Sequence, residues 1–159
     1  MTILTTPIYA QIDQILTKYP ADQRQSAVIS ALMLVQKHNN GWLTTELMDQ
    51  VADYIRMPKI AVYEVASFYS LFELKPIGKH KISVCTNISC MLRGSDEVVN
   101  YLKQKLQINL GETTADGKFT LKSVECLAAC GGAPMLQIGD TYHENLTTAK
   151  LDSILAGLR

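Results

Sequence analysis

VCTNISC (residues 84–90) and ECLAAC (residues 125–130) are the two stretches that decide the fold. They hold all four cysteines of the chain: Cys85, Cys90, Cys126 and Cys130. Each stretch follows a run typical of a short β-strand, Lys81–Val84 before the first and Phe119–Val124 before the second. Since a sheet fixes where a loop begins, we expect these loops to position the thiols together.

Three kinds of cysteine site are compatible with the C-x4-C and C-x3-C spacings of these two stretches. Four thiolates hold a structural Zn²⁺, and the same number hold an iron–sulfur cluster. Two disulfides would fit a secreted protein. The spacing alone leaves all three open.

The bulk composition limits the classes of protein that the chain can belong to. With 159 residues, of which 47% are hydrophobic, it can form one ordinary domain or two small ones with packed cores. Its 15 basic and 15 acidic residues lack the basic excess of a nucleic-acid binder. No apolar run reaches the roughly 18–20 residues of a membrane span, and the N-terminus lacks the basic region of a secretory signal. We therefore expect a cytoplasmic protein without direct membrane insertion, whose cysteines bind a metal or carry redox chemistry.

The first half of the chain has helical periodicity throughout. Thr6-Pro7 predicts the start of one helix, and a second is predicted from about Asp22 to His38. Thr44 or Thr45 can cap a third helix, and Pro58 opens a fourth. We predict a helical bundle over residues 1–74.

Strands and helices alternate in the second half, after a hinge near Lys75–Lys79. Besides the two strands before the cysteines, the pattern predicts a strand at Met135–Ile138. Helices are predicted over residues 95–106, with Ser95 as the cap, and after Thr147. The fold class is therefore α+β, with a helical bundle at 1–74 and an α/β domain with a small mixed sheet at 75–159.

Two other functions are disfavoured by the sequence. Thr44–Met57 and Pro58–Ser70 could form a helix-turn-helix, but residues 44–70 are net acidic, which is unsuitable for contacting phosphates. The chain also lacks G-x-G-x-x-G and Walker loops, so we do not expect it to bind NADH or FMN itself.

Longer motifs resemble one known family over nearly the whole chain. They are YEVASFY (residues 63–69), VCT (84–86), CMLRG (90–94), ECLAAC (125–130), APM (133–135) and ENLT (144–147). The chain resembles the 24 kDa-type subunit, called the E subunit in bacteria, of NADH:quinone oxidoreductase (respiratory complex I). The resemblance implies a thioredoxin-like ferredoxin domain after the helical domain. It also implies one [2Fe–2S] cluster, with Cys85, Cys90, Cys126 and Cys130 as its ligands.

The resemblance further implies an electron-transfer role within an oxidoreductase. The partners would be the flavoprotein subunit that binds FMN and NADH, with which the cluster exchanges electrons, and neighbouring iron–sulfur subunits. The isolated chain would have no complete active site or catalytic residue of its own. It would lie in the cytoplasm, at the periphery of the inner membrane.

Two alternatives and one departure accompany this interpretation. Similar subunits serve the diaphorase modules of NAD-linked hydrogenases and formate dehydrogenases, and a zinc-stabilised interaction module is the alternative from another class. The family often has Gly where this chain has Ala128. If that position requires a positive φ, Ala128 is strained by about 1 kcal/mol.

Overall fold

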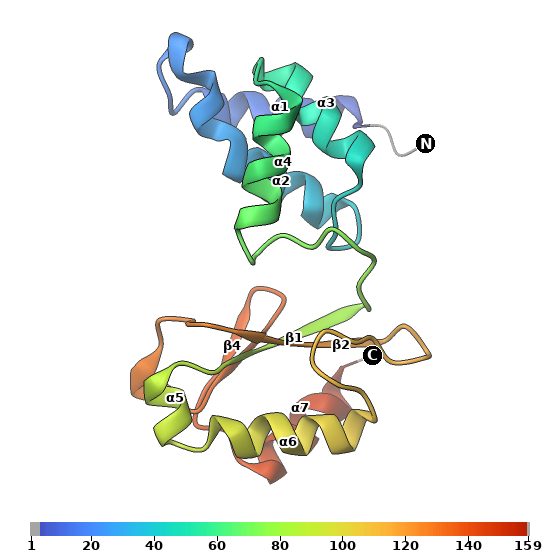
Figure 1. Cartoon of the computed structure of the whole chain (residues 1–159), viewed down its shortest axis with the longest axis vertical. Helices are drawn as coiled ribbons and strands as arrows, with labels where there is room; N and C mark the ends of the chain where they lie inside the picture. The colour runs from blue at the N-terminus through green and yellow to red at the C-terminus, as the bar shows by residue number, and fades with distance from the viewer. Residues whose placement is uncertain (1–3, 159) are drawn as a thin grey trace. The chain divides into compact units, whose positions relative to one another are not determined.

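The computed structural model describes residues 4–158. Arg159 and the first three residues of the N-terminal segment considered for a secretory signal lie outside the described residues. The chain divides into two compact units, and the boundary in the sequence falls between Pro76 and Ile77. We describe each unit by itself (Figure 1). Among residues 4–158, no helix combines the length and the apolar composition that crossing a membrane requires.

The first unit is helical, as the periodicity predicts. It contains α1 (Thr6–Leu16), a 3-10 helix (Ala21–Ala27), α2 (Val28–His38), α3 (Thr45–Ile55) and α4 (Lys59–Phe68). Each α-helix turns its apolar stripe inward, and Ile12, Leu32, Val51 and Val62 are fully buried. The predicted start of the second helix, at about Asp22, is wrong. The chain bends at Gln23 inside the 3-10 helix, and the regular α-helix begins only at Val28.

Residues at the helix starts decide where these helices begin. Thr44 caps α3, where its hydroxyl accepts a hydrogen bond from the Leu47 N–H at 3.2 Å. Helix α1 begins one residue earlier than predicted, so Thr5 occupies the cap position and Pro7 lies inside the first turn. Pro58 directly precedes α4, as its fixed φ favours.

The second unit is built on a mixed sheet. Within the described residues the strands are β1 (His80–Cys85), β2 (Phe119–Val124), β3 (Leu136–Ile138) and β4 (Thr141–His143), in the order β2-β1-β3-β4. Strands β1 and β2 are parallel, whereas β3 runs antiparallel to both β1 and β4. The parallel pair needs a crossover, and the helical segment between β1 and β2 supplies it.

Helices α6 (Ser95–Leu106) and α7 (Thr148–Gly157) cover one face of this sheet (Figure 1). Val98, Leu102 and Leu151 pack from the helices against Ile82 and Leu121 of the strands. This arrangement confirms the predicted α+β class with helices on a small mixed sheet.

Two predictions for this unit are wrong in detail. A short helix, α5 (Ile88–Leu92), lies where the sequence predicts a loop, so Cys90 belongs to a helix. Ser95 does not cap α6. Gly94 takes the cap position with φ +91°, a left-handed value that the turn from α5 into α6 requires, and Ser95 is buried as the first helical residue.

Candidate metal centre

Parallel pairing of β1 and β2 brings the two cysteine stretches to one end of the sheet. Cys85, the last residue of β1, is in register with Val124, the last residue of β2. Thr86 fastens the two loop starts together, because its N–H and its hydroxyl both donate to the Val124 carbonyl, at 3.0 and 3.2 Å. The Cys85 thiol interacts with Cys90 and Cys126, and Cys90 interacts with Cys130. All four sequence-predicted residues therefore lie in one region.

Cys85 is buried, yet its surroundings favour the thiolate. Burial alone would raise its pKa, but the N–H groups of Asn87 and Leu127 and the neighbouring thiols of Cys90 and Cys126 lower the pKa overall. Its backbone N–H donates to the Met135 carbonyl at 3.2 Å, which holds the end of β1 in place. Cys85 is thus a sulfur positioned among backbone donors.

Cys90 is the second buried thiol and lies on α5. Asn87 caps this helix, since its side chain accepts from the Ile88 N–H at 2.8 Å. Burial, together with the hydrogen bond and charge of Cys85 and the charge of Cys130, raises the pKa of Cys90 to about 11. Cys85 and Cys90 pack with Ala133 and Met135 in a small apolar cluster.

The second cysteine loop is bent by a left-handed residue. Ala128 has φ +58°, and its N–H donates to the Cys126 sulfur at 3.3 Å. The departure from the family pattern therefore falls at a position with a positive φ, the case in which strain is expected. The loop's own backbone donor is directed at one of the four thiols.

Sequence reasoning missed the segment that holds the turn after Cys130. The Asn145 N–H donates to the Gly132 carbonyl at 2.6 Å, and the Leu146 N–H donates to the Pro134 carbonyl at 3.0 Å. Glu144 packs so closely on Gly132 that an added Cβ would lie 2.5 Å from the Glu144 Cβ. A Gly-Gly pair beside a cysteine would let a bound group approach the backbone closely, but the side chain that lies against Gly132 is that of Glu144. The ENLT motif (residues 144–147) was the feature of the sequence that could have revealed this segment, because it contains Glu144, Asn145 and Leu146.

The two cysteine pairs differ in exposure. Cys85 and Cys90 are buried, whereas Cys126 and Cys130 are exposed, and all four are free of disulfides. Within residues 4–158, no three His, Cys, Asp or Glu side chains are arranged to hold one metal ion. A [2Fe–2S] cluster shares four thiolates between two irons, so it calls for two pairs. Four free thiols in two neighbouring pairs fit that donor set.

Other residues that the sequence singled out lie around or away from these thiols. Arg93, beside Cys90, is exposed and lines a shallow groove of 420 Å³ with Pro134 and Asn145. Among the aromatic residues at positions 63–72, Phe72 is buried whereas Phe68 is 81% exposed.

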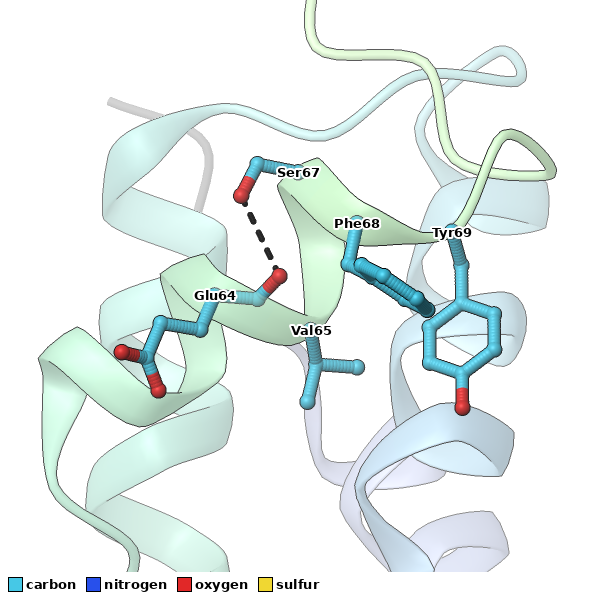
Figure 2. Close-up of a pocket in the computed structure, with 5 residues that line it drawn as sticks. All are labelled: Glu64, Val65, Ser67, Phe68 and Tyr69. Atoms are coloured by element: carbon cyan, nitrogen blue, oxygen red, sulfur yellow. Dashed lines mark hydrogen bonds between the residues drawn. The ribbon is translucent and has the colours of Figure 1, made fainter.

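A second groove of 420 Å³ lies in the helical unit at the end of α4. Figure 2 shows Phe68 and Tyr69 beside each other in this groove, and their ring centroids are 5.1 Å apart. Glu64, Val65 and Ser67 complete the lining, so the groove contains no thiol and one carboxylate.

Comparison with known proteins is consistent with this geometry. The E subunit of the NADH-quinone oxidoreductase of Rickettsia bellii is 46% identical over 147 residues, which are 92% of this chain and 88% of that protein. The mitochondrial NADH dehydrogenase [ubiquinone] flavoprotein 2 of Dictyostelium discoideum is 47% identical over 145 residues, which are 91% of this chain and 59% of that protein. Both relatives are named as parts of an NADH-oxidising oxidoreductase.

A solved structure shares the fold. An NAD⁺-reducing [NiFe]-hydrogenase in its air-oxidised state matches with a TM-score of 0.71 at 20% identity, over 88% of this chain and 24% of the hydrogenase chain. A family model described as thioredoxin-like [2Fe-2S] ferredoxin matches residues 12–159. The chain belongs to the thioredoxin-like [2Fe–2S] ferredoxin family.

Proposed function

We propose that this chain is the electron-transfer subunit of an NADH:quinone oxidoreductase, and that Cys85, Cys90, Cys126 and Cys130 hold its one [2Fe–2S] cluster. The observation that carries the proposal is the convergence of four free thiols at the paired ends of β1 and β2. The relatives named as the E subunit of that oxidoreductase, at 46% identity over most of both chains, support the choice of complex.

The chain's own groups are suited to holding such a cluster. A bound [2Fe–2S] cluster supplies one-electron transfer at a potential that depends on hydrogen bonds to its sulfurs and on solvent exposure. Here the backbone N–H groups of Asn87 and Leu127 favour a thiolate at Cys85, and that of Met135 favours one at Cys90. The Ala128 N–H donates a hydrogen bond to the Cys126 sulfur at 3.3 Å. These donors stabilise negative charge on sulfur and so favour the reduced form.

The partner side of the proposal follows from what the chain lacks and what its relatives are named. No nucleotide-binding loop is present in the sequence, so we place FMN and NAD in a flavoprotein partner subunit, with which this chain exchanges electrons. Neighbouring iron–sulfur subunits would complete the electron path. The complex would hold this chain on the cytoplasmic side, at the periphery of the membrane.

Low-temperature EPR of the anaerobically purified protein tests the cluster. We expect no signal in the oxidised protein and a rhombic S = 1/2 signal after dithionite. Zinc found by elemental analysis, with no acid-labile sulfide and no EPR signal, would replace electron transfer with the zinc-stabilised interaction module.

Substitution tests the ligand assignment. Cys126→Ser should lose the cluster or change its spectrum, because an alkoxide replaces a thiolate at one iron. Ala129→Ser is the matched control: it adds a hydroxyl to the same loop and leaves every thiol in place. Unchanged iron content and an unchanged spectrum in Cys126→Ser would exclude Cys126 as a ligand.

Co-purification separates the two host complexes. The tagged chain should carry quinone-reductase subunits out of its native membranes. Recovery of a hydrogenase or a formate dehydrogenase instead would assign the chain to a diaphorase module, with the cluster unchanged.

A further inference from the structure

The carboxylate of Glu144 lies against the turn that follows Cys130. Gly132 is buried in the 3-10 helix Cys130–Gly132, and a Cβ added to it would meet the Glu144 side chain, with the carboxylate oxygen Oε2 as its nearest atom. Two residues of chain span at most about 7 Å, so the carboxylate lies within roughly 10 Å of the Cys130 backbone. This is about one Debye length at an ionic strength of 0.1 M, so screening leaves part of its field at Cys130.

Hydrogen bonds hold the backbone around Glu144, and no salt bridge neutralises its side chain. The Asn145 N–H donates to the Gly132 carbonyl at 2.6 Å, which ties this segment to the same turn. The Lys150 ammonium donates to the backbone carbonyl of Glu144 rather than to its carboxylate. Within residues 4–158 the ion pairs lie elsewhere, so the Glu144 carboxylate keeps its negative charge beside the turn.

Few other charges lie close to the thiols. None of residues 85–92 or 126–135 is Asp, Glu, Lys or Arg. Arg93 and Glu125, which flank these segments in the sequence, have opposite signs. Glu144 adds a further negative charge, which reaches the turn from a distant part of the chain.

We propose that the Glu144 carboxylate lowers the reduction potential of the cluster held by the four thiols. The proposal rests on the proposed function and gives a part in it to a residue outside the ligand set. Reduction adds one electron, and so one negative charge, to the cluster, and a carboxylate nearby opposes that charge. The Ala128 N–H has the opposite effect, because a hydrogen bond to the Cys126 sulfur favours the reduced form.

The expected effect is moderate, because Glu144 is exposed to solvent. A unit charge about 10 Å away changes the ratio of reduced to oxidised cluster by about two- to fourfold, if the effective dielectric constant lies between about 40 and 80. A threefold change corresponds to about 28 mV, at 59 mV for each tenfold change in a one-electron couple.

Potentiometric titration of the EPR signal measures this effect on the anaerobically purified full-length chain at low ionic strength. Glu144→Gln keeps the shape of the side chain and removes its charge, so its midpoint potential should lie about 28 mV above that of the wild type, a threefold change. Glu144→Ala should give a rise of the same size, whereas Glu144→Asp keeps the charge and should stay close to the wild type.

Glu112→Gln is the matched control. It also removes one carboxylate from the second unit, but the Glu112 carbonyl accepts from the Leu121 N–H at 3.1 Å. Leu121 precedes Cys126 by five residues, roughly 16 Å along an extended strand, which exceeds the Debye length. Its midpoint potential should therefore equal that of the wild type.

Salt separates the effect of charge from that of packing. In about 1 M KCl the Debye length falls to about 3 Å, so the difference between Glu144→Gln and the wild type should shrink to within the error of the titration. A shift that persists in this salt would overturn the proposal, and so would a shift of equal size in Glu144→Asp, because Glu144 would then act through the structure of the turn.

The remaining outcomes distinguish this inference from the proposed function. Equal potentials for the wild type and Glu144→Gln at low ionic strength would overturn the inference. So would loss of the cluster from both Glu144→Gln and Glu144→Ala, because the residue would then be needed to hold the turn. Absence of any [2Fe–2S] signal in the wild-type chain would instead overturn the proposed function.

Discussion

Ala128 is the clearest case of a residue whose conformation conflicts with its chemistry. Its φ of +58° places it in the left-handed region, where a Cβ crowds the backbone at a cost of about 1–2 kcal/mol. The same geometry directs its N–H to the Cys126 sulfur. The strain is thus tied to the site, and it can be relieved by removing the Cβ.

Ala128→Gly should therefore stabilise the second cysteine loop. We expect a gain of about 0.5–1 kcal/mol, since the relieved strain is offset in part by the greater freedom of Gly in the unfolded chain. Ala129→Gly is the control, because Ala129 lies next in the loop with a φ of −116°, so Gly there relieves no left-handed strain; it brings the entropic penalty and loses the packing of the Ala129 methyl group on the apolar cluster. Anaerobic thermal loss of visible absorbance measures both. A lower midpoint for Ala128→Gly than for Ala129→Gly would contradict the strain.

Residue types at the site were predictable, but their surroundings were not. The four cysteines indicate a thiol site because nothing else in the sequence offers such a donor set. Their division into a buried and an exposed pair depends on Met135 and Ala133, which pack on one pair only. The contact of Glu144 with Gly132 also joins segments that no local pattern connects.

At the scale of single helices, the residue that caps α3 gives a prediction for the stability of the helical unit. Thr44→Ala should destabilise the helical unit by about 1 kcal/mol, because it removes the side-chain acceptor for the Leu47 N–H at the start of α3. Thr45→Ala should change stability by less than about 0.5 kcal/mol, since Thr45 is exposed inside the helix. Urea unfolding followed by Trp42 fluorescence measures the stability of both variants. Equal losses of stability in the two variants would show that Thr44 does not cap α3.

A hydrogen-bonded carboxylate joins α3 to α4 and makes the unit sensitive to pH. Asp49 accepts from the Tyr63 hydroxyl and pairs with Lys59 at 3.0 Å. The hydrogen bond from Tyr63, followed by that from Lys59, holds the pKa of Asp49 below its ordinary value. A depressed carboxyl pKa contributes stability above the unfolded pKa, and this contribution is lost as the pH falls through the folded pKa.

Asp49→Asn should therefore lower the urea midpoint of the helical unit near neutral pH. The difference from the wild type should shrink as the pH is lowered below about 4, the ordinary pKa of an aspartate, and vanish once the pH has fallen through the lower pKa of the folded Asp49 carboxyl. Asp53→Asn is the control, because Asp53 is more exposed and lies 4.0 Å from Lys59. A midpoint difference for Asp49→Asn that is the same at all pH values would show that the charge is irrelevant.

Helices with a long periodic pattern were predictable, whereas short or non-local elements were not. The periodicity of α1, α3 and α6 exceeds two turns and carries its own signal. Helix α5 spans only five residues, and its exposed apolar side chains imitate a strand or a loop. The parallel pairing of β1 with β2 depends on a crossover of more than thirty residues, about which local propensity carries no information.

Across the whole molecule, two separate cores predict two unfolding transitions. The core of the helical unit and the core around the sheet share no residue. Trp42, the single tryptophan of the chain, reports on the first unit, and the visible absorbance of the cluster reports on the second. We expect different urea midpoints for the two probes under anaerobic conditions. Coincident midpoints would show that the chain unfolds as one unit, which would count against 1–74 and 75–159 as separate domains.

The unequal exposure of the two cysteine pairs has a consequence for the newly made protein. The thiols of Cys126 and Cys130 are exposed to solvent, whereas those of Cys85 and Cys90 are buried. Peroxide would therefore oxidise Cys126 and Cys130 first, toward sulfenic acid and beyond. Neither of these residues belongs to the packed cores, so a chain damaged in this way would stay folded. Oxidative stress would then accumulate folded subunits that can no longer be loaded, and chaperones and proteases that recognise unfolded chains would pass them by.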